Sequence, residues 1–303
     1  MHSDRPILGI LLMVGFCALA PLGDSLAKLL GSRISLGEIV LVRFALQTVI
    51  LLPIIRLTGR KLGLRRSDWG LMIFRSALHI VGISAMFLAL RYLPLAEALA
   101  IAFVEPFLLL LLGAYVLKET VGVRRLVACA VGFAGTLLVI QPSFAAVGWA
   151  ALLPLLVAIV FALFIMTTRQ LATRSDPIVL QAISGALAFL LLLPAIAFGQ
   201  SIPALALIWP DSGTLWLLLA LGFVGTFAHL LMTWSLRHAP SATLAPIQYL
   251  ELPFATLIGW LVFRDIPNDV AALGIVVSMA AGLYIVLRER AQGHEVVPQE
   301  PPV

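Results

Sequence analysis

The sequence predicts an all-α membrane protein with ten transmembrane helices, arranged as two inverted repeats of five helices each. Three observations lead to this fold class. The 303 residues are 61% hydrophobic and 12% charged, with a mean hydropathy of +1.08, which is far more apolar than a soluble domain. Apolar runs of about 20 residues, the length that crosses a bilayer, recur from the N-terminus to Arg288. A stretch in the first half of the chain also matches a stretch in the second half.

Each predicted span is expected to be a helix. Lipid offers the backbone no hydrogen-bonding partner, and the runs are too long and continuous for the strands of a β-barrel. The spans cover residues 7–30, 36–56, 70–91, 95–117, 124–141, 147–168, 177–198, 214–236, 241–263 and 269–287. The first run is interpreted as a retained span and not as a cleaved signal peptide, because Pro21 directly follows the cleavage-like Ala18-Leu19-Ala20.

Lys and Arg residues gather in the connections on one side of the predicted membrane. With the N-terminus inside, the inner connections hold most of them, at Arg5, 56–66, 118–125, 169–174, Arg237, Arg288 and Arg290. The outer connections hold Lys28, Arg33, Arg91 and Arg264. The positive-inside rule therefore predicts that both termini are cytoplasmic. The basic pI of about 9.7 has the same origin, and no nucleic-acid partner is expected because no basic cluster is interleaved with aromatic residues.

The internal match is clearest in the fourth and ninth spans. There RYLPLAEALAIAFVEPFLLLLLGAYVLKE, which begins at Arg91, aligns without gaps with RHAPSATLAPIQYLELPFATLIGWLVFRD, which begins at Arg237. At this offset of 146 residues, Glu105 matches Glu251. Earlier in the chain the offset is 141 residues, and the difference falls in the loop between the second and third spans, where insertions are tolerated.

The match divides the chain into residues 1–141 and 147–288, each with five predicted spans. Because five is odd, the second repeat must enter the membrane from the opposite side. Inverted repeats are typical of secondary transporters, whose substrate site lies near the middle of the bilayer between the repeats. The remaining residues, 291–303, are polar and Pro-rich and are expected to form a disordered cytoplasmic tail.

The fifth helix of each repeat carries small residues at every fourth position. They are Ala128, Gly132 and Thr136 in the first repeat, and Gly274, Ser278 and Gly282 at the offset of 146 residues. Small residues at this spacing allow helices to pack closely. The pattern predicts either bracing contacts within the protein or the face of a homodimer.

Glu105 and Glu251 are the strongest candidates for a functional site. Each lies about ten residues into its span, where an ionisable group is costly and a functional role is the default hypothesis. Pro106 and Pro253 follow them closely, and a proline frees a backbone carbonyl one turn earlier and kinks the helix. The pattern predicts a polar patch at mid-membrane that faces protein or water. Static hydrogen bonding between helices is the alternative.

Two histidines and two further polar residues lie near the same depth. If His79 or His229 reaches one of the glutamates, the pair can exchange a proton near neutral pH, which is a hypothesis of proton coupling. Ordinary packing is the alternative for each histidine. Gln248 and Tyr249 directly precede Glu251 and, with it, predict a surface for a mid-sized organic solute.

A third group of charges lies in the first two spans. Asp24 and Lys28 are one helical turn apart, and Arg43 lies at a similar depth in the next span. These three side chains form either a paired structural network or an outer mouth that binds an anionic or zwitterionic group of the substrate. Arg75 lies about one turn inside the cytoplasmic end of the third span and is expected to snorkel to the surface.

The segments LLLGAYVLKE in the first repeat and PIQYLELPFATLIGWLVFRD, followed by GIVVSMAAGLYIV, in the second are similar to those of a known family. With the ten-helix inverted repeat, they resemble the EamA branch of the drug/metabolite transporter superfamily over the whole chain except the tail. The resemblance implies a central cavity between the repeats and a place in the cytoplasmic (inner) membrane of a bacterium. It also implies uptake of riboflavin or S-adenosylmethionine, or export of amino acids and other metabolites.

The expected function is therefore secondary transport of a small amphipathic metabolite by alternating access. An enzyme is not expected, because HExxH, GxSxG, Asp-rich metal and Gly-rich phosphate motifs are absent from the sequence. No cofactor or metal is expected either, since Cys17 and Cys129 show no metal-binding spacing. A channel or receptor-like protein is the alternative, but neither explains why two oppositely oriented halves carry the same acid-bearing helix.

Overall fold

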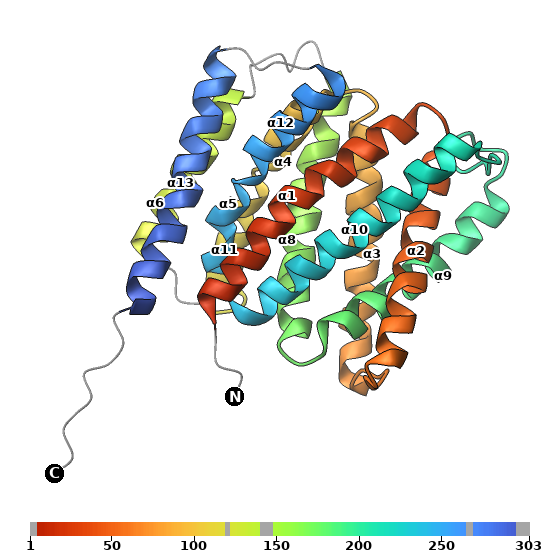
Figure 1. Cartoon of the computed structure of the whole chain (residues 1–303), viewed down its shortest axis with the longest axis horizontal. Helices are drawn as coiled ribbons and strands as arrows, with labels where there is room; N and C mark the ends of the chain where they lie inside the picture. Colours follow the sequence, from red (N-terminus) through yellow and green to blue (C-terminus); the bar gives the residue numbers. More distant parts are fainter. Residues whose placement is uncertain (1–4, 119–121, 140–147, 265–268, 295–303) are drawn as a thin grey trace.

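The computed structural model describes residues 5–118, 122–139, 148–264 and 269–294, and the regular structure in these ranges is helical (Figure 1). The first half of the chain contains α1 (Pro6–Gly31), α2 (Leu36–Leu57), the short 3-10 helix η1 (Arg66–Asp68), α3 (Trp69–Ala89), α4 (Leu95–Ala102), α5 (Glu105–Tyr115) and α6 (Val123–Val139). The second half contains η2 (Gly148–Ala151), α8 (Leu152–Ala172), α9 (Pro177–Phe198), α10 (Ser212–His238), α11 (Ser241–Gln248), α12 (Glu251–Phe263) and α13 (Asp269–His294).

The predicted class, an all-helical membrane protein, is confirmed. Among the described residues, 8 helical segments are long and apolar enough to cross a membrane. They correspond to the first four predicted spans and to the sixth through ninth. The fifth predicted span becomes α6, which has 17 residues, and the tenth becomes α13, whose apolar part runs from Ala272 to Tyr284.

The two acid-bearing spans differ from the prediction, since each is broken into two helices and not simply kinked. α4 ends at Ala102 and α5 begins at Glu105, while α11 ends at Gln248 and α12 begins at Glu251. Pro106 and Pro253 fall in the first turns of α5 and α12. A proline loses no intrahelical hydrogen bond there, because the first N–H groups of a helix have no partner within it. Each proline therefore starts a new helix in mid-span.

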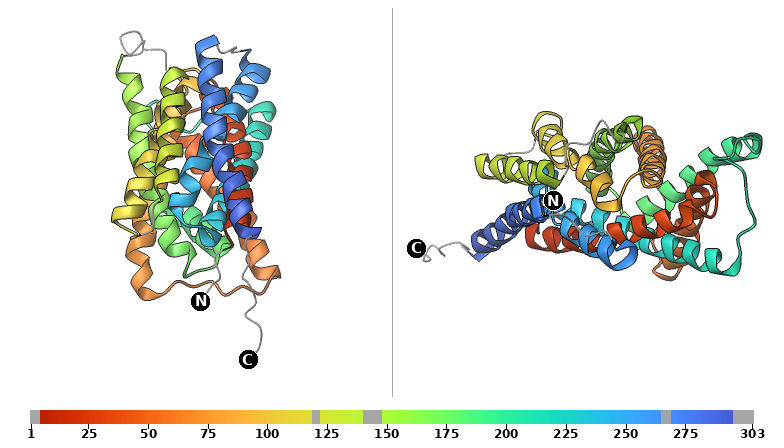
Figure 2. Two further views of the ribbon diagram at one scale, coloured as in Figure 1. Left: turned by 90° about the vertical axis from the view of Figure 1, so that its left-hand side faces the viewer. Right: turned by 90° about the horizontal axis from the view of Figure 1, so that it is seen from above.

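The helices form two layers with a helix pair at each edge (Figures 1 and 2). In one layer α1 packs between α10 and the pair α11/α12, and in the other α8 packs between α3 and the pair α4/α5. The pairs α2/α9 and α6/α13 close the two edges. Each layer thus combines helices from both halves of the chain. The contacts follow the correspondence between the halves. The pair of α1 and α10 corresponds to the pair of α8 and α3, and each edge pair joins a helix of the first half to its own counterpart in the second half.

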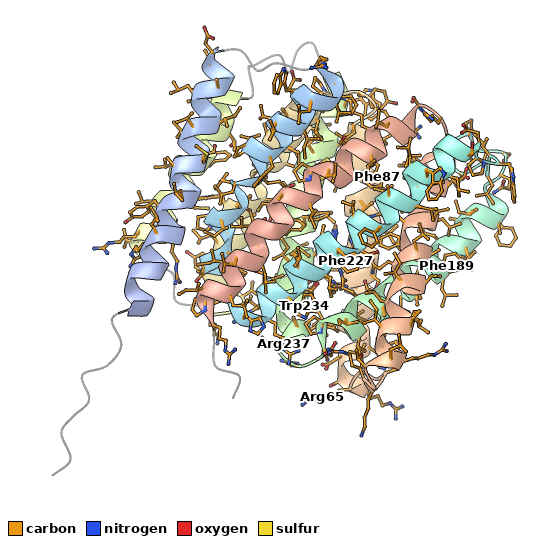
Figure 3. All side chains as sticks on the ribbon, viewed as in Figure 1. Arg65, Phe87, Phe189, Phe227, Trp234 and Arg237 are labelled. Carbon is orange, nitrogen blue, oxygen red and sulfur yellow. The ribbon has the colours of Figure 1, made fainter. Side chains whose placement is uncertain are left out.

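The described chain begins and ends at the same end of this bundle, which we call the terminal face (Figure 1). The turns after α2, α8 and α10 lie there, and Figure 3 places Arg65 and Arg237 at this face. The connections after α1 and α9 lie at the other end, the opposite face. α13 continues through His294, so residues 291–294 are helical where a tail was predicted, because the helix extends past the last apolar turn. The rest of the predicted tail lies outside the described residues.

The small residues of the fifth and tenth predicted spans meet inside the chain. α6 packs along α13, and the Ser278 hydroxyl donates a hydrogen bond to the Gly132 carbonyl at 3.3 Å. Gly132 lies against the ring of Tyr249, and a Cβ on Gly282 would lie 3.0 Å from Leu250. These faces are therefore covered by the protein's own helices. They brace the break between α11 and α12, and in this conformation they do not form a face open to a second copy of the chain.

Candidate functional site

A cavity lies between the two helical layers near the middle of the bundle. Side chains from α1, α2, α3, α8 and α10 line it, together with residues at the breaks of both divided spans. Its volume is about 70 Å³, which holds several water molecules but is smaller than the roughly 300–1,000 Å³ of typical small-molecule sites. Most predicted site residues line it, namely Asp24, Arg43, Glu105, His229, Gln248 and Glu251.

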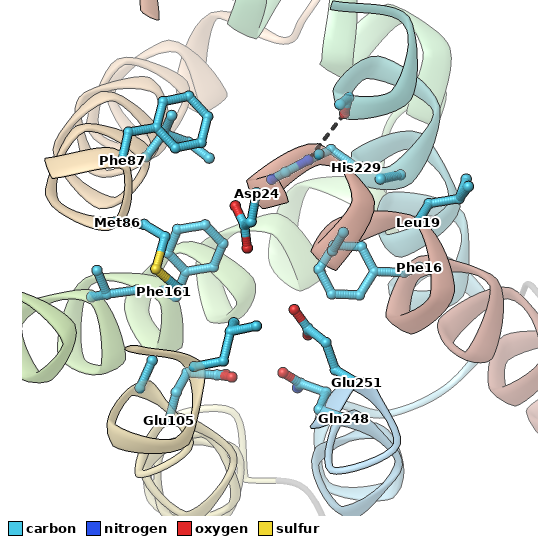
Figure 4. Close-up of a pocket in the computed structure, with 18 of the residues that line it drawn as sticks. Phe16, Leu19, Asp24, Met86, Phe87, Glu105, Phe161, His229, Gln248 and Glu251 are labelled. Atoms are coloured by element: carbon cyan, nitrogen blue, oxygen red, sulfur yellow. Dashed lines mark hydrogen bonds between the residues drawn. The ribbon is translucent and has the colours of Figure 1, made fainter. Parts of the chain in front are cut away.

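Three carboxyl groups point into this cavity (Figure 4). Glu105 and Glu251 are the first residues of α5 and α12, and each is only 7% exposed. Asp24 faces them from α1, and Glu251 lies close enough to both other acids to interact with them electrostatically. The Glu105 Oε1 atom has no hydrogen-bond partner among the described residues. The helix breaks thus place the two matching acids at the starts of helices, where they face one shared cavity.

Arg43 and His229 form a buried contact at the wall of the same cavity. Arg43 Nη2 lies 3.0 Å from His229 Nδ1, and the Gly225 carbonyl oxygen lies 3.1 Å from the same nitrogen. A guanidinium only donates and a carbonyl only accepts, so one neutral tautomer of His229 accepts from Arg43 and the other donates to Gly225. Gly225 permits the close approach, since a Cβ there would lie 2.9 Å from Arg43 Nε. His229 Nδ1 is therefore held by Arg43 and Gly225, Nε2 has no partner within the described ranges, and the ring forms no hydrogen bond to Glu105 or Glu251.

His79 and Tyr249, which the sequence also nominates, do not line the cavity but support it. The His79 ring is fully buried, with centroid distances of 4.9 Å to Phe44, 4.5 Å to Phe164 and 4.6 Å to His229. Tyr249 packs 5.9 Å from the Phe103 ring, and its hydroxyl donates to the Phe103 carbonyl at 3.5 Å. Tyr249 thereby connects the two helix breaks.

The predicted group of Asp24, Lys28 and Arg43 is divided in the structure. Asp24 and Arg43 both line the central cavity. Lys28 donates to the Leu93 carbonyl at 3.1 Å, and its ammonium lies 4.8 Å from the centroid of the Phe263 ring. The two cavity residues therefore belong with the glutamates, whereas Lys28 lies against the backbone and an aromatic ring outside the cavity lining.

Two kinds of site residue were missed from the sequence. The first is aromatic: Phe16, Phe87 and Phe161 line the cavity but do not differ in sequence from ordinary apolar helix residues. The second is Arg75, which was expected to snorkel to the surface but is 0% exposed. It is held by hydrogen bonds to Thr168 and Gln181, each of 2.8 Å. Gln181 could have indicated a buried partner for Arg75, because it is a polar residue in an apolar span near the same end of the bundle.

Loop contacts join the two halves at both faces. At the opposite face, the Gly37 N–H donates to the Ala204 carbonyl at 2.8 Å, and the Ile208 N–H donates to Glu38 Oε2 at 2.9 Å. Hydrogen bonds from Thr214, with a smaller contribution from Arg33, hold the pKa of Asp211 below its usual value at this face.

At the terminal face the contacts include ion pairs. Arg174 Nη1 lies 3.5 Å from Asp68 Oδ1, and Arg60 pairs with Asp176. Contacts between loops of the first and second halves are thus present at both ends of the bundle.

Apolar membrane-spanning helices around a largely apolar cavity that contains three carboxyl groups define a multi-pass membrane protein with an internal site. The model of the EamA-like transporter family matches residues 7–141 and, again, residues 148–288. The chain therefore belongs to the EamA-like transporter family, as its sequence motifs suggested.

Relatives of known name are also transporters. The chain is 30% identical to a riboflavin transporter of Rhizobium johnstonii over 71% of this chain and 69% of that protein. It is 26% identical to a riboflavin transporter of Brucella anthropi over 91% and 98% of the two chains. It is 25% identical to an S-adenosylmethionine uptake transporter of Rickettsia prowazekii over 89% of each. These relatives indicate a bacterial membrane transporter of small metabolites.

A solved crystal structure shares the fold. Its TM-score is 0.71, and the match covers 96% of this chain and 100% of the other at 19% identity.

Proposed function

We propose that the chain is a secondary transporter that carries a small amphipathic metabolite through the central cavity by alternating access. The observation that carries this proposal is that Glu105 and Glu251, which match at an offset of 146 residues, face one cavity from the two halves of the chain. Secondary transporters built from inverted repeats place their sites between the repeats, on broken helices of this kind.

Contacts between matching residues support the proposed inverted repeat. Tyr249 and Phe103, and likewise Ser278 and Gly132, are separated by 146 residues and are hydrogen-bonded to one another. Residues that touch their own counterparts must lie beside the axis that relates the two halves. The proposed axis therefore passes through the helix breaks and between α6 and α13, at the depth of the glutamates.

The loop contacts at both faces support alternating access. Each face is held by contacts between the two halves, and the cavity between them is smaller than typical ligand sites. We propose that the contacts at one face separate when the cavity opens to that face. The basic residues at the terminal face, including Arg65 and Arg237, support its assignment as the cytoplasmic face.

The cavity lining suggests the chemistry of the solute. Three carboxyl groups against one Arg favour a solute with a cationic or zwitterionic part, and the surrounding phenylalanines favour a planar ring. S-adenosylmethionine has both features and is transported by one of the named relatives. Riboflavin is the second candidate, favoured by the aromatic lining and by the relative that is 30% identical. The proposed direction of transport is uptake, because the S-adenosylmethionine relative is named an uptake transporter. Proton exchange at Glu105 and Glu251 is the proposed coupling.

Counterflow in liposomes tests this proposal. Purified protein is reconstituted with unlabelled S-adenosylmethionine, riboflavin or tryptophan inside, and entry of the same labelled compound is followed. A carrier gives saturable entry that is accelerated by solute on the far side, and we expect this for S-adenosylmethionine or riboflavin. Entry that rises linearly with concentration, without acceleration, indicates a channel. Binding without any flux indicates a receptor, and either result would contradict the proposal.

A further inference from the structure

A second cluster of buried polar side chains lies between the central cavity and the terminal face. Arg75 on α3, Thr168 on α8, and Gln181 on α9 meet there, and each is 0% exposed. Gln47 on α2 joins them by donating to the Gln181 carbonyl at 2.7 Å. The cluster thus joins four helices, two from each half of the chain.

The hydrogen bonds of the cluster determine which of its atoms remain free. Arg75 Nη2 donates to Gln181 Oε1, so the other atom of that amide group, Nε2, is a donor. Arg75 Nε donates to the Thr168 hydroxyl, which itself donates to the Phe164 carbonyl at 2.6 Å. Arg75 Nη1 and Gln181 Nε2 have no partner among the described residues. The unused groups on these two residues are therefore both donors. Gln47 Oε1 is an acceptor without a described partner, so the cluster has more unused donor atoms than acceptor atoms.

The positive charge of Arg75 is not balanced by an acid in the described part of the chain. Its described partners are two neutral side chains and the ring of Phe164, whose centroid lies 4.6 Å from Arg75 Cζ. A buried charge without a counter-charge is costly, and so are buried donors without acceptors. An anion would satisfy both requirements at once, because a carboxylate or phosphate accepts several N–H groups from a guanidinium and its neighbours.

A continuous row of side chains connects this cluster to the cavity. Phe164 lies against Arg75 on one side and 4.5 Å from the His79 ring, measured between centroids. The His79 ring is tilted against the His229 ring at a centroid distance of 4.6 Å, and His229 contacts Arg43 at the cavity wall. Neither ring nitrogen of His79 has a partner among the described residues. A solute that leaves the cavity toward the terminal face would meet further polar atoms before Arg75.

We propose that Arg75 and Gln181 form a second binding site, which takes the carboxylate or phosphate group of a solute on its passage between the cavity and the terminal face. This deepens the proposed function, on which it rests, by naming an anionic group as part of the transported molecule, which favours S-adenosylmethionine, a carboxylate, over riboflavin, which has neither group. The acids of the cavity then face the cationic or neutral part of the same molecule. The alternative is that Arg75 only joins α3 to α8 and α9.

The substitution Gln181→Glu separates the two interpretations. It turns the side chain that already accepts a hydrogen bond from Arg75 into a carboxylate. An ion pair within the protein then takes the place of a bound anion. If the site binds anions, this variant is more stable than the wild type without anions and no longer responds to them. Arg75→Gln removes the charge and also loses the response. Thr168→Val breaks only a structural hydrogen bond, so we expect a lower unfolding temperature with an intact response.

The experiment measures the thermal unfolding midpoint of the purified full-length chain in sodium phosphate or sodium acetate, against sodium chloride at equal ionic strength. For the wild type we expect at least one of the two anions to raise the midpoint by roughly 2–4 °C near saturation. The matched control Gln170→Glu, which places the same change at a partly buried position on α8, keeps the wild-type response. Response to one anion alone identifies the preferred group.

Two results would overturn the proposal: no response of the wild type to either anion, or an equal response in Gln181→Glu. If Gln181→Glu does not fold, the other two variants decide. The site is supported if Arg75→Gln loses the response to anions and Thr168→Val keeps it. Any other combination contradicts the site. The measurement involves no transport, so a failed anion site leaves the counterflow test of the proposed function unaffected, and the reverse also holds.

Discussion

Glu105 and Glu251 each begin a helix in mid-membrane, and this position explains why a carboxylate and a proline occur together in an apolar run. The proline starts the helix, and the acid before it faces the cavity. The sequence could indicate this because an acid and a proline at matching places in two repeats have few other uses in a membrane. It could not indicate that Arg43 would orient His229, because that contact depends on how α2 and α10 cross.

The first prediction concerns proton coupling at these acids. Glutamine has nearly the shape of glutamate but cannot take up or release a proton at neutral pH. In Glu105→Gln or Glu251→Gln, we expect uptake driven by a pH gradient to fall by about tenfold or more, equivalent to about 1.4 kcal/mol in the barrier. Counterflow, which needs no net proton movement, should fall less. Both fluxes are measured in the same proteoliposomes.

The control for this prediction is Glu97→Gln. Glu97 lies on α4, in the same predicted span as Glu105, but it is exposed and does not line the cavity. This variant should keep the wild-type rate and pH response. Wild-type behaviour of both cavity variants would instead show that the acids act only as hydrogen-bonding or structural groups.

Among the helices, the breaks depend on support from α6 and α13. The sequence indicated close packing by small residues but left open whether a second copy of the chain was the partner. The small residues of α6 and α13 pack against each other and against the turn that holds Tyr249 and Leu250, because both helices lie behind the break. Spacing along one helix cannot reveal this, since the same stripe of small residues fits any closely packed neighbour.

The second prediction tests this support with a pair of Gly→Ala substitutions. A Cβ at Gly132 would lie 2.8 Å from Tyr249 Cγ, so the ring must move. Gly132→Ala should destabilise the protein by about 1–3 kcal/mol through overpacking. At Gly259 on α12 a Cβ would have no neighbour within 4 Å, so Gly259→Ala should be neutral or stabilising by up to about 1 kcal/mol. Thermal or urea unfolding in detergent measures both, and equal effects would contradict the proposed brace.

The third prediction concerns Asp211, whose side chain caps α10 by accepting from the Thr214 N–H at 3.2 Å. Its pKa in the folded protein is depressed, chiefly by hydrogen bonds from Thr214. A depressed pKa stabilises the fold at pH values above the unfolded pKa of about 3.9, and this contribution is lost as the pH falls through the folded pKa. Asp211→Asn keeps a good cap but removes the charge.

We therefore expect Asp211→Asn to be less stable than the wild type at pH 7, with a difference that stays constant down to about pH 4 and shrinks only as the pH falls further, through the lower folded pKa of Asp211. Unfolding midpoints at several pH values from neutral to strongly acidic measure the difference. A gap of the same size at all pH values would show that the hydrogen-bonding geometry, and not the charge, is responsible.

At the scale of the whole molecule, the two halves of the chain are interleaved and do not form two separate bundles. The sequence match indicated two similar halves, but it contains no information on which helices meet. That α1 packs with α10 and α8 with α3 follows from packing between distant segments, which a single sequence does not encode locally. Interleaving has a consequence for movement, because the loops that join the halves at one face also determine whether that face can open.

The fourth prediction concerns these loop contacts. Arg174 and Asp68 join the halves at the terminal face, while Arg33 and Asp211 interact at the opposite face. Arg33 and Arg174 match at the offset of 141 residues, and both aspartates directly precede the third helix of their half, so the two pairs are counterparts. Loss of one pair should favour opening at its own face only. The arginine of each pair is exposed, although Asp68 is buried, so we expect a contribution of about 1 kcal/mol and a shift in population of up to about fivefold.

A cysteine at Ala20, which lines the cavity, reports the direction of opening in a background without Cys17 and Cys129. A membrane-impermeant maleimide is added to inverted membrane vesicles or to intact spheroplasts. Arg174→Gln should label faster in inverted vesicles, where the cytoplasmic face is outside, and Arg33→Gln should label faster in spheroplasts. Opposite signs from two equivalent substitutions require that the faces open in alternation. If both variants label faster from the same side, the two pairs do not act as counterparts, and if neither changes, the faces are held closed by other contacts.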